Sequence, residues 1–346
     1  MSTINTPHVL NTGRIQYIDL AKGFCICLVV FHHYCYQYTN MDSFVNHALI
    51  SFRMPLYFIL SGFFFKDYGS LLNFTKRKTN KILIPFIFWG WINAILVLVV
   101  KLLKGELMTL RPLESIYQEQ IPNYPVWFLW GLFLTGIIFY LIHLISTYFH
   151  KYQPIVILSV SLLVGIIGFN LGNKGINLPC YLDTALTVTP FYAFGYLLKK
   201  YTSILYPNKI DKYLILIAIA CFAYVLIFAD KVSFIENNMK HANAFIMYSC
   251  GVVGSLGILA VAKRINSLPI FSYLGRYSII ILCTHTLFYQ FVFHYIIQYF
   301  QNNTDIPLLY ISIACFVIMC LLYLLIIPLI KKFLPYFCAQ KDVIKV

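Results

Sequence analysis

Two adjacent histidines, His32 and His33, lie near the end of an apolar stretch that opens with charged residues, RIQYIDLAKGFCICLVVFHHY over 14–34. If this stretch is an α-helix, Lys22 and His33 lie roughly 16 Å apart along its axis. Ionisable groups inside a membrane cost several kcal/mol unless they face protein or water, so they are candidate functional groups. The stretch therefore predicts a site with a cation at one level and an imidazole suited to proton transfer at another.

Arg53 is the next candidate, within the apolar stretch SFRMPLYFILSGFFFK that follows. Because the chain direction reverses between the two stretches, Arg53 is expected at roughly the depth of His33. A guanidinium there is suited to bind an anion that forms beside the histidine, as an oxyanion stabiliser does. The alternative is that Arg53 extends to the outer interface while its aliphatic stem packs. Its position inside the predicted helix favours the functional role.

A cluster of basic residues follows, in the segment KRKTNKILIP. Lys76, Arg77, Lys78 and Lys81 precede the third apolar stretch. Such a cluster can anchor the topology, contact anionic lipid, or bind the phosphates of a soluble cosubstrate. Composition alone favours the topological anchor.

The elements that must position these residues are helices in a membrane. Apolar residues make up 60% of the chain and charged residues 11%, and the mean hydropathy is +0.76. These values predict an all-α polytopic membrane bundle of about ten transmembrane helices. The predicted spans are centred near Leu28, Phe58, Ile92, Phe139, Leu163, Phe191, Ile219, Val253, Phe288 and Val317.

Charge sets the expected orientation. The net charge is +14, and most basic residues fall in the connections on one side of the predicted bundle. By the positive-inside rule both termini are then cytoplasmic. Nucleic-acid binding is not expected, because the basic residues are dispersed over short loops without a soluble platform. A lipid bilayer is the expected surrounding, and a bacterial cytoplasmic membrane the expected location.

One membrane domain over residues 14–335 is expected, flanked by cytoplasmic tails at 1–13 and 336–346. The longest outer connection, about 104–125, is too short for a separate domain. Most of the ten cysteines lie in apolar stretches and none forms a Cys-x-x-Cys pair, so no metal site is expected. Spaced glycines, namely Gly168 with Gly172 and Gly251 with Gly254 and Gly257, predict close helix contacts.

Several fragments together resemble the acyltransferase-3 family of integral membrane O-acyltransferases. The resemblance rests on their order and spacing from residue 14 to about 290, since each fragment alone is weak. The fragments are Arg14 and Asp19 ahead of Lys22, Lys22 with ten residues before His33, FRMPLYFILSG, the basic cluster before ILIP, Trp127-Phe128-Leu129, and LGRYSIIILCTH ending at His285.

The resemblance implies a ten-helix membrane domain, a short-chain acyl-CoA donor with acetyl as the expected acyl group, and a carbohydrate acceptor in the cell envelope. It implies that His33 is the catalytic histidine and that Lys22 occupies the position of a family arginine. Lys78 and Lys81 likewise replace the arginines of an Arg-x-x-Arg element. Lysine keeps the charge but lacks the planar fork of arginine.

A mechanism follows from this resemblance. The phosphates of acyl-CoA are expected near Lys22, Lys78, Lys81 and Arg14, with the thioester directed toward His33. A neutral histidine is a suitable general base for an acceptor hydroxyl, and a covalent acyl-histidine intermediate is a second possibility. Acyl-CoA is expected as a cosubstrate, with no permanently bound cofactor.

Two further residues each have two interpretations. His285, with its family position, is expected in the catalytic site, and the alternative is a histidine satisfied by a neighbouring helix. Trp127 is a candidate sugar-binding residue, although an aromatic of the interfacial belt is the other interpretation. For the whole chain, the alternative function is a transporter or flippase for a glycan or lipid-linked sugar.

Overall fold

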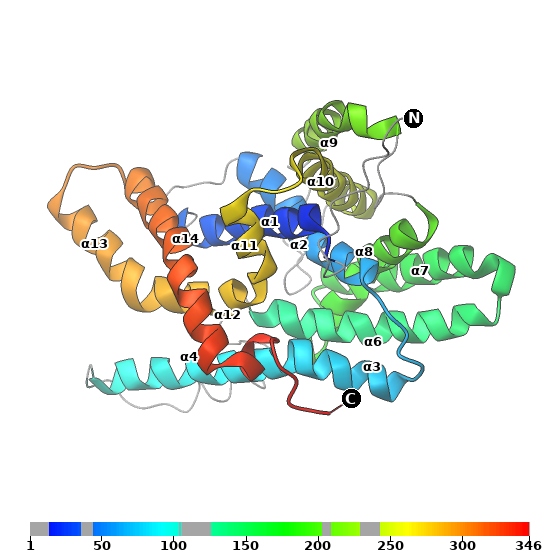
Figure 1. The fold of residues 1–346 in the computed structure, drawn as a ribbon, viewed down its shortest axis with the longest axis horizontal. Coiled ribbons are helices and arrows are strands. Elements are labelled where there is room, and N and C mark those ends of the chain that lie inside the picture. The colour runs from blue at the N-terminus through cyan, green and yellow to red at the C-terminus, as the bar shows by residue number, and fades with distance from the viewer. Residues whose placement is uncertain are drawn as a thin grey trace, which may run out of the picture.

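The protein is all-helical wherever the computed structural model describes it, which is residues 14–35, 44–103, 105, 126–202, 209–228 and 243–345 (Figure 1). The helices are α1 (Gln16–Cys35), α2 (Phe44–Phe63), α3 (Leu71–Lys78), α4 (Ile84–Leu103), α6 (Trp127–Thr147), α7 (Gln153–Asn173), α8 (Leu182–Tyr201), α9 (Leu214–Phe228), α10 (Ala244–Ile265), α11 (Pro269–Arg276), α12 (Ser278–Phe288), α13 (His294–Asn303) and α14 (Leu308–Phe333). The predicted tail 1–13 and most of the predicted outer connection 104–125 lie outside the described residues.

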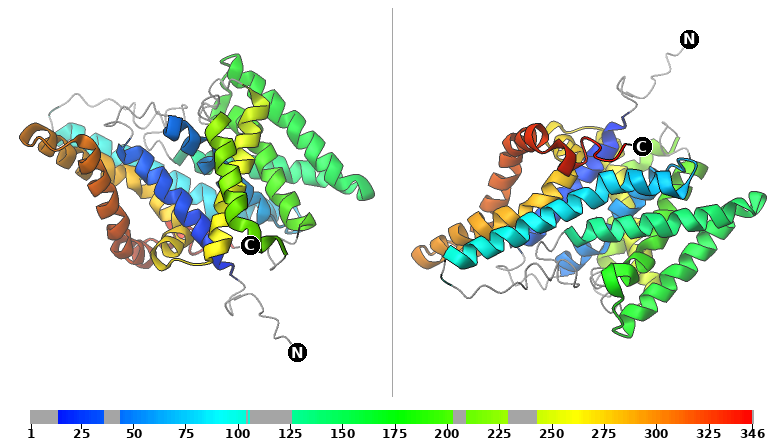
Figure 2. Two further views of the ribbon diagram at one scale, coloured as in Figure 1. Left: turned by 90° about the horizontal axis from the view of Figure 1, so that it is seen from above. Right: turned by 90° about the horizontal axis from the view of Figure 1, so that it is seen from below.

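Two short π-helical segments interrupt longer helical runs. Thr79–Leu83 joins α3 to α4, and Tyr289–Phe293 joins α12 to α13. Figure 2 shows α3 and α4 as one long rod along the bundle. A π-helical turn inserts an extra residue into a helix and occurs often at functional sites.

The described helices confirm a polytopic membrane bundle. Eight helical runs are long and apolar enough to cross a membrane, namely α1, α3 with α4, α6, α7, α9, α10, α12 with α13, and α14. Each of the ten predicted centres lies within a helix, but α2 and α8 are not among the eight. Eight described helical runs therefore qualify as spans by length and composition, and the more polar helices α2 and α8 occupy the other two predicted positions.

Packing explains why α2 and α8 depart from the expected composition. These two helices lie against each other, and α8 also packs against α6 and α7. Close approach is possible because a Cβ at Gly62 would collide with the backbone of Tyr192, and one at Gly195 with the backbone of Ile59. A helix enclosed by protein needs no apolar residues on every face, so polar side chains are tolerated there.

The predicted glycine contacts are present. A Cβ at Gly168 would meet Thr187 of α8, while Cβ atoms at Gly251 and Gly254 would meet the rings of Phe191 and Phe52. By contrast, α9 and α14 carry many exposed large apolar side chains, which suits helices at the lipid boundary.

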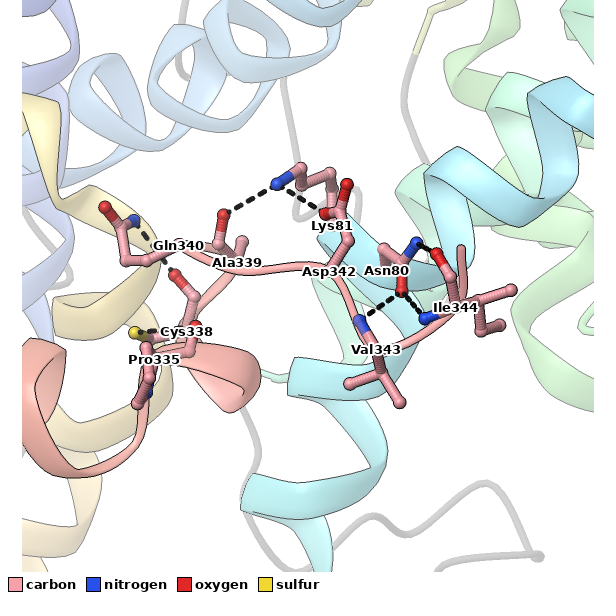
Figure 3. A network of polar contacts seen from close by, with 9 residues as sticks. All are labelled: Asn80, Lys81, Pro335, Cys338, Ala339, Gln340, Asp342, Val343 and Ile344. Carbon is pink, nitrogen blue, oxygen red and sulfur yellow. Dashed lines mark hydrogen bonds and ion pairs between the residues drawn. The ribbon is translucent and has the colours of Figure 1, made fainter. Parts of the chain in front are cut away.

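The predicted C-terminal tail does not extend away from the bundle. Residues 335–345 turn back across the junction of α3 and α4, where Phe337 stacks on Phe88 with ring centroids 3.9 Å apart. Trp89 Nε1 donates a hydrogen bond to the Phe337 carbonyl at 2.9 Å. This arrangement places the end of the chain beside the basic cluster (Figure 3).

Candidate active site

A cavity of about 450 Å³ lies between α1, α2, the α3–α4 junction, α6 and α12. It brings together three predicted site residues that are far apart in the sequence, Lys22, Lys78 and Lys81. The remainder of its wall is mostly apolar and aromatic. These wall residues are Ile26, Met54, Tyr57, Leu60, Ser61, Phe64, Ile82, Phe128, Leu129, Leu132, Ser278, Ile279 and Leu282.

The three lysines of the cavity differ in their surroundings. The half-buried Lys22 ammonium lies 5.4 Å from the centre of the Phe64 ring, and that of half-buried Lys78 lies 5.4 Å from the centre of the Phe74 ring. Within the described part of the chain, neither Lys22 nor Lys78 forms an ion pair. Half-buried cations without an acidic partner are costly in a folded protein, and a bound anion would offset that cost.

Helical periodicity connects the cavity to the histidines. The eleven residues from Lys22 to His33 rotate α1 by about 20° beyond three full turns, so both side chains lie on one face. Ile26, which lines the cavity, lies on that face between them. On α12, Leu282 lines the cavity and His285 follows one turn later. Two adjacent helices, α1 and α12, thus each carry a cavity-lining residue and one of the histidines.

His33 and His285 are in contact between α1 and α12. Their ring centroids are 5.1 Å apart, with the ring planes inclined at 52°. His32 is buried and contacts His33 edge to face, with centroids 5.3 Å apart. The structure therefore groups two imidazoles from different helices, α1 and α12, with a third beside them.

The tautomer of His285 follows from its hydrogen bond. His285 is completely buried, and its Nδ1 lies 2.8 Å from the carbonyl oxygen of Ile281. Because a carbonyl only accepts hydrogen bonds, Nδ1 carries the proton and Nε2 presents its lone pair. Among the described residues, Nε2 has no hydrogen-bond partner. His285 is thus held with a basic nitrogen available inside the bundle.

Arg53 joins the two histidines in the interior. Its side chain is only 3% exposed, so the guanidinium does not extend to the surface. It lies within electrostatic range of His33, His285 and Cys25. This brings a permanent positive charge within electrostatic range of both imidazoles.

The two π-helical segments border this arrangement at its two ends. Thr79–Leu83 carries Lys81 at the cavity, and Tyr289–Phe293 begins directly after the helix that carries His285. The amide of Tyr289 bonds to the His285 carbonyl. Both irregular segments therefore coincide with the candidate site.

A comparison with protein families identifies the chain. The acyltransferase-3 family model, described as an acyltransferase domain, matches residues 15–327. The chain belongs to this family. Searches of curated proteins and of solved structures gave no match to it. Family membership makes the protein a multi-pass membrane acyltransferase, which favours the enzyme over the transporter considered as the alternative.

Two further predicted site residues of this acyltransferase, Arg14 and Trp127, also do not line the cavity. Arg14 forms an ion pair with Asp19 at 2.7 Å, and Asp19 also lies 3.5 Å from Nε of Arg276. Trp127 is buried, with its ring centroid 6.0 Å from that of Tyr181. In this structure Arg14 pairs with Asp19 at the start of α1, Asp19 links α1 to Arg276 of α11, and Trp127 is part of the core.

The sequence analysis did not identify the hydroxyl-bearing residues of the cavity wall as part of the site. The Tyr57 hydroxyl donates a hydrogen bond to the Lys22 carbonyl at 3.0 Å and also bonds to Ser278. Met54, Tyr57 and Ser61 follow one another at helical spacing, which is a periodic signal for one face of α2. The spacing defines the face, but only the packed helices show that this face lines a cavity.

Proposed function

We propose that this acyltransferase moves a short acyl group, with acetyl as the expected group, from acyl-CoA to a hydroxyl of a cell-envelope carbohydrate. One observation carries the proposal: the cavity with its lysines lies on the same helix faces as the His33–His285 pair. An anionic donor with a long flexible arm suits this geometry, because its charged groups can bind at the lysines while its thioester reaches the histidines.

Donor binding is assigned to the cavity. Lys22 and Lys78 are half-buried cations over aromatic rings, and Lys81 lies at the more exposed edge. Charge-assisted hydrogen bonds from such lysines are suited to the phosphates of CoA. The apolar walls between them suit the less polar arm of the donor. The donor-binding end of the site is therefore proposed to lie on the side of the membrane that the sequence predicts to be cytoplasmic.

Acyl transfer is assigned to the histidines and Arg53. His33 removes the proton from the acceptor hydroxyl while the oxygen forms a bond to the thioester carbonyl carbon. The negative charge that develops on the carbonyl oxygen is stabilised by the Arg53 guanidinium. Collapse of the tetrahedral intermediate breaks the carbon–sulfur bond, and the leaving thiolate takes the proton from the His33 imidazolium. His285 packs against the His33 ring and presents Nε2 as a second basic nitrogen beside it.

The acceptor is proposed to enter from the face opposite to the donor. The positive-inside pattern places the lysine cavity toward the cytoplasm of a bacterial cell, so an envelope carbohydrate approaches from outside. The membrane itself and the acyl-CoA are the further partners in this scheme.

The proposal is tested with purified protein in detergent or in vesicles. Acetyl-CoA is added with and without an envelope polysaccharide, and released CoA is measured by its free thiol. We expect thiol release that depends on the protein and increases with the acceptor, together with an acetyl mass increment on the glycan. Absence of both from folded protein, with acetyl-CoA and with longer acyl-CoA, would contradict the proposed function.

A further inference from the structure

The C-terminal segment, defined here as residues 335–345, is firmly attached beside the donor cavity (Figure 3). The side chain of Asn80 is completely buried. Its Oδ1 accepts hydrogen bonds from the amides of Val343 and Ile344 at 2.9 and 2.8 Å, and its Nδ2 donates to the Ile344 carbonyl at 2.8 Å. Three bonds to one buried amide, with the stacked Phe337 described above, hold the segment in place.

The next residue along the chain, Lys81, makes a different kind of contact with the same segment. Its Nζ lies 2.7 Å from Oδ1 of Asp342 and donates a hydrogen bond to the Ala339 carbonyl at 3.1 Å. Both side chains of the ion pair are exposed, at 46% for Lys81 and 42% for Asp342. Exposed ion pairs are weak because water competes for both charges. The ion pair is therefore easier to break than the attachment through Asn80.

Lys81 also differs from the other cavity lysines. Within the described residues, Lys22 and Lys78 form no ion pair, whereas Lys81 contacts a carboxylate supplied by the chain itself. A carboxylate at 2.7 Å from an ammonium occupies a position that a phosphate oxygen also suits.

We propose that Asp342 competes with a phosphate of the donor for Lys81, and so sets the affinity of the cavity for acyl-CoA. This inference rests on the proposed acyl-CoA donor. When the donor binds, the Lys81–Asp342 contact breaks while Asn80 keeps the segment in place. Asp342 is thus a residue that lowers donor affinity, located at the edge of the binding site and more than two hundred residues from the basic cluster in sequence.

The test is CoA binding to purified full-length protein in detergent, measured by calorimetry at low salt. Asp342→Asn removes the competing charge and is expected to tighten CoA binding about two- to fivefold, as befits an exposed ion pair. The matched control is Asp305→Asn, because Asp305 is also exposed, lies between α13 and α14, and does not line the cavity. That control changes the net charge equally and is expected to bind CoA as the wild type does.

A double-mutant cycle tests whether the effect passes through Lys81. In a Lys81→Gln background, Asp342→Asn is expected to leave CoA binding unchanged. The proposal is overturned if Asp342→Asn weakens or does not change binding, or if it tightens binding equally without Lys81. Wild-type protein that does not bind CoA overturns the donor assignment and this inference together. Wild-type binding with no response to Asp342→Asn overturns this inference alone.

Discussion

The two ends of the candidate site differ in space, exposure and chemistry. At one end, a cavity of about 450 Å³ is bordered by three lysines and many aromatic and aliphatic side chains. At the other end, Arg53 and His285 are buried and His33 is half-buried, with the imidazole centroids of His33 and His285 5.1 Å apart. The first end has space and charge for a ligand, and the second has closely placed groups for proton transfer.

This difference indicates a division of labour along α1 and α12. Binding groups that lie far from the reacting atoms affect donor affinity, whereas groups at the reacting atoms affect the rate of the chemical step. Replacements at the two ends should therefore separate in KM and kcat. The predictions below test that separation, from the largest effect to the smallest.

The largest effect is expected at His33. His33→Ala removes the proposed general base, which contributes about 10²–10⁴ in rate, so kcat should fall by that factor with the protein still folded and inserted. The value of kcat is measured as the rate of acetyl transfer from acetyl-CoA, monitored through the thiol that is released. The matched control is His32→Ala on the same turn, which should retain most activity. Equal activity in wild type and His33→Ala would exclude His33 as the base.

The second-largest effect is expected when Arg53 is replaced. Arg53→Lys keeps a positive charge in the interior but loses the planar fork, so stabilisation of the oxyanion should weaken. We expect a decrease in kcat of roughly 10²-fold, the lower range for loss of one oxyanion donor, with little change in KM. Steady-state kinetics at saturating donor measure this. If KM rises and kcat does not change, Arg53 binds substrate and takes no part in the transition state.

A smaller effect, on KM more than on kcat, is expected at the cavity. The double replacement Lys78→Gln and Lys81→Gln should raise the KM for acyl-CoA by about tenfold, with a smaller change in kcat. Because loss of basic residues can also alter topology, loop labelling must first show correct insertion. A correctly inserted variant with unchanged KM at low and moderate salt would show that the cluster is only a topological anchor.

The sequence predicted helices better than it predicted neighbours. Every centre that the apolar stretches predicted lies within a helix of the structure. Arg53 was expected at the depth of His33 because reversing the chain direction fixes the register of adjacent spans. These results depend only on local periodicity and chain direction.

Contacts between distant segments were not predictable in this way. The pairing of Lys81 with Asp342 joins residues separated by most of the chain, and no periodic signal connects them. The meeting of His33 with His285 was suggested only by family position, since helix order in space is not encoded in single-span patterns. Likewise, nothing in the span pattern indicated that α8 packs against α2, α6 and α7.

The most direct test of the division of labour is equilibrium binding of CoA to two variants of folded protein, Lys22→Gln and His33→Ala. These residues lie on one face of one helix, so the pair differs in depth and chemistry alone. We expect His33→Ala to bind CoA as the wild type does, and Lys22→Gln to bind about tenfold more weakly, as for loss of a charged hydrogen bond. Weaker binding in His33→Ala with normal binding in Lys22→Gln would contradict the assignment of the two ends.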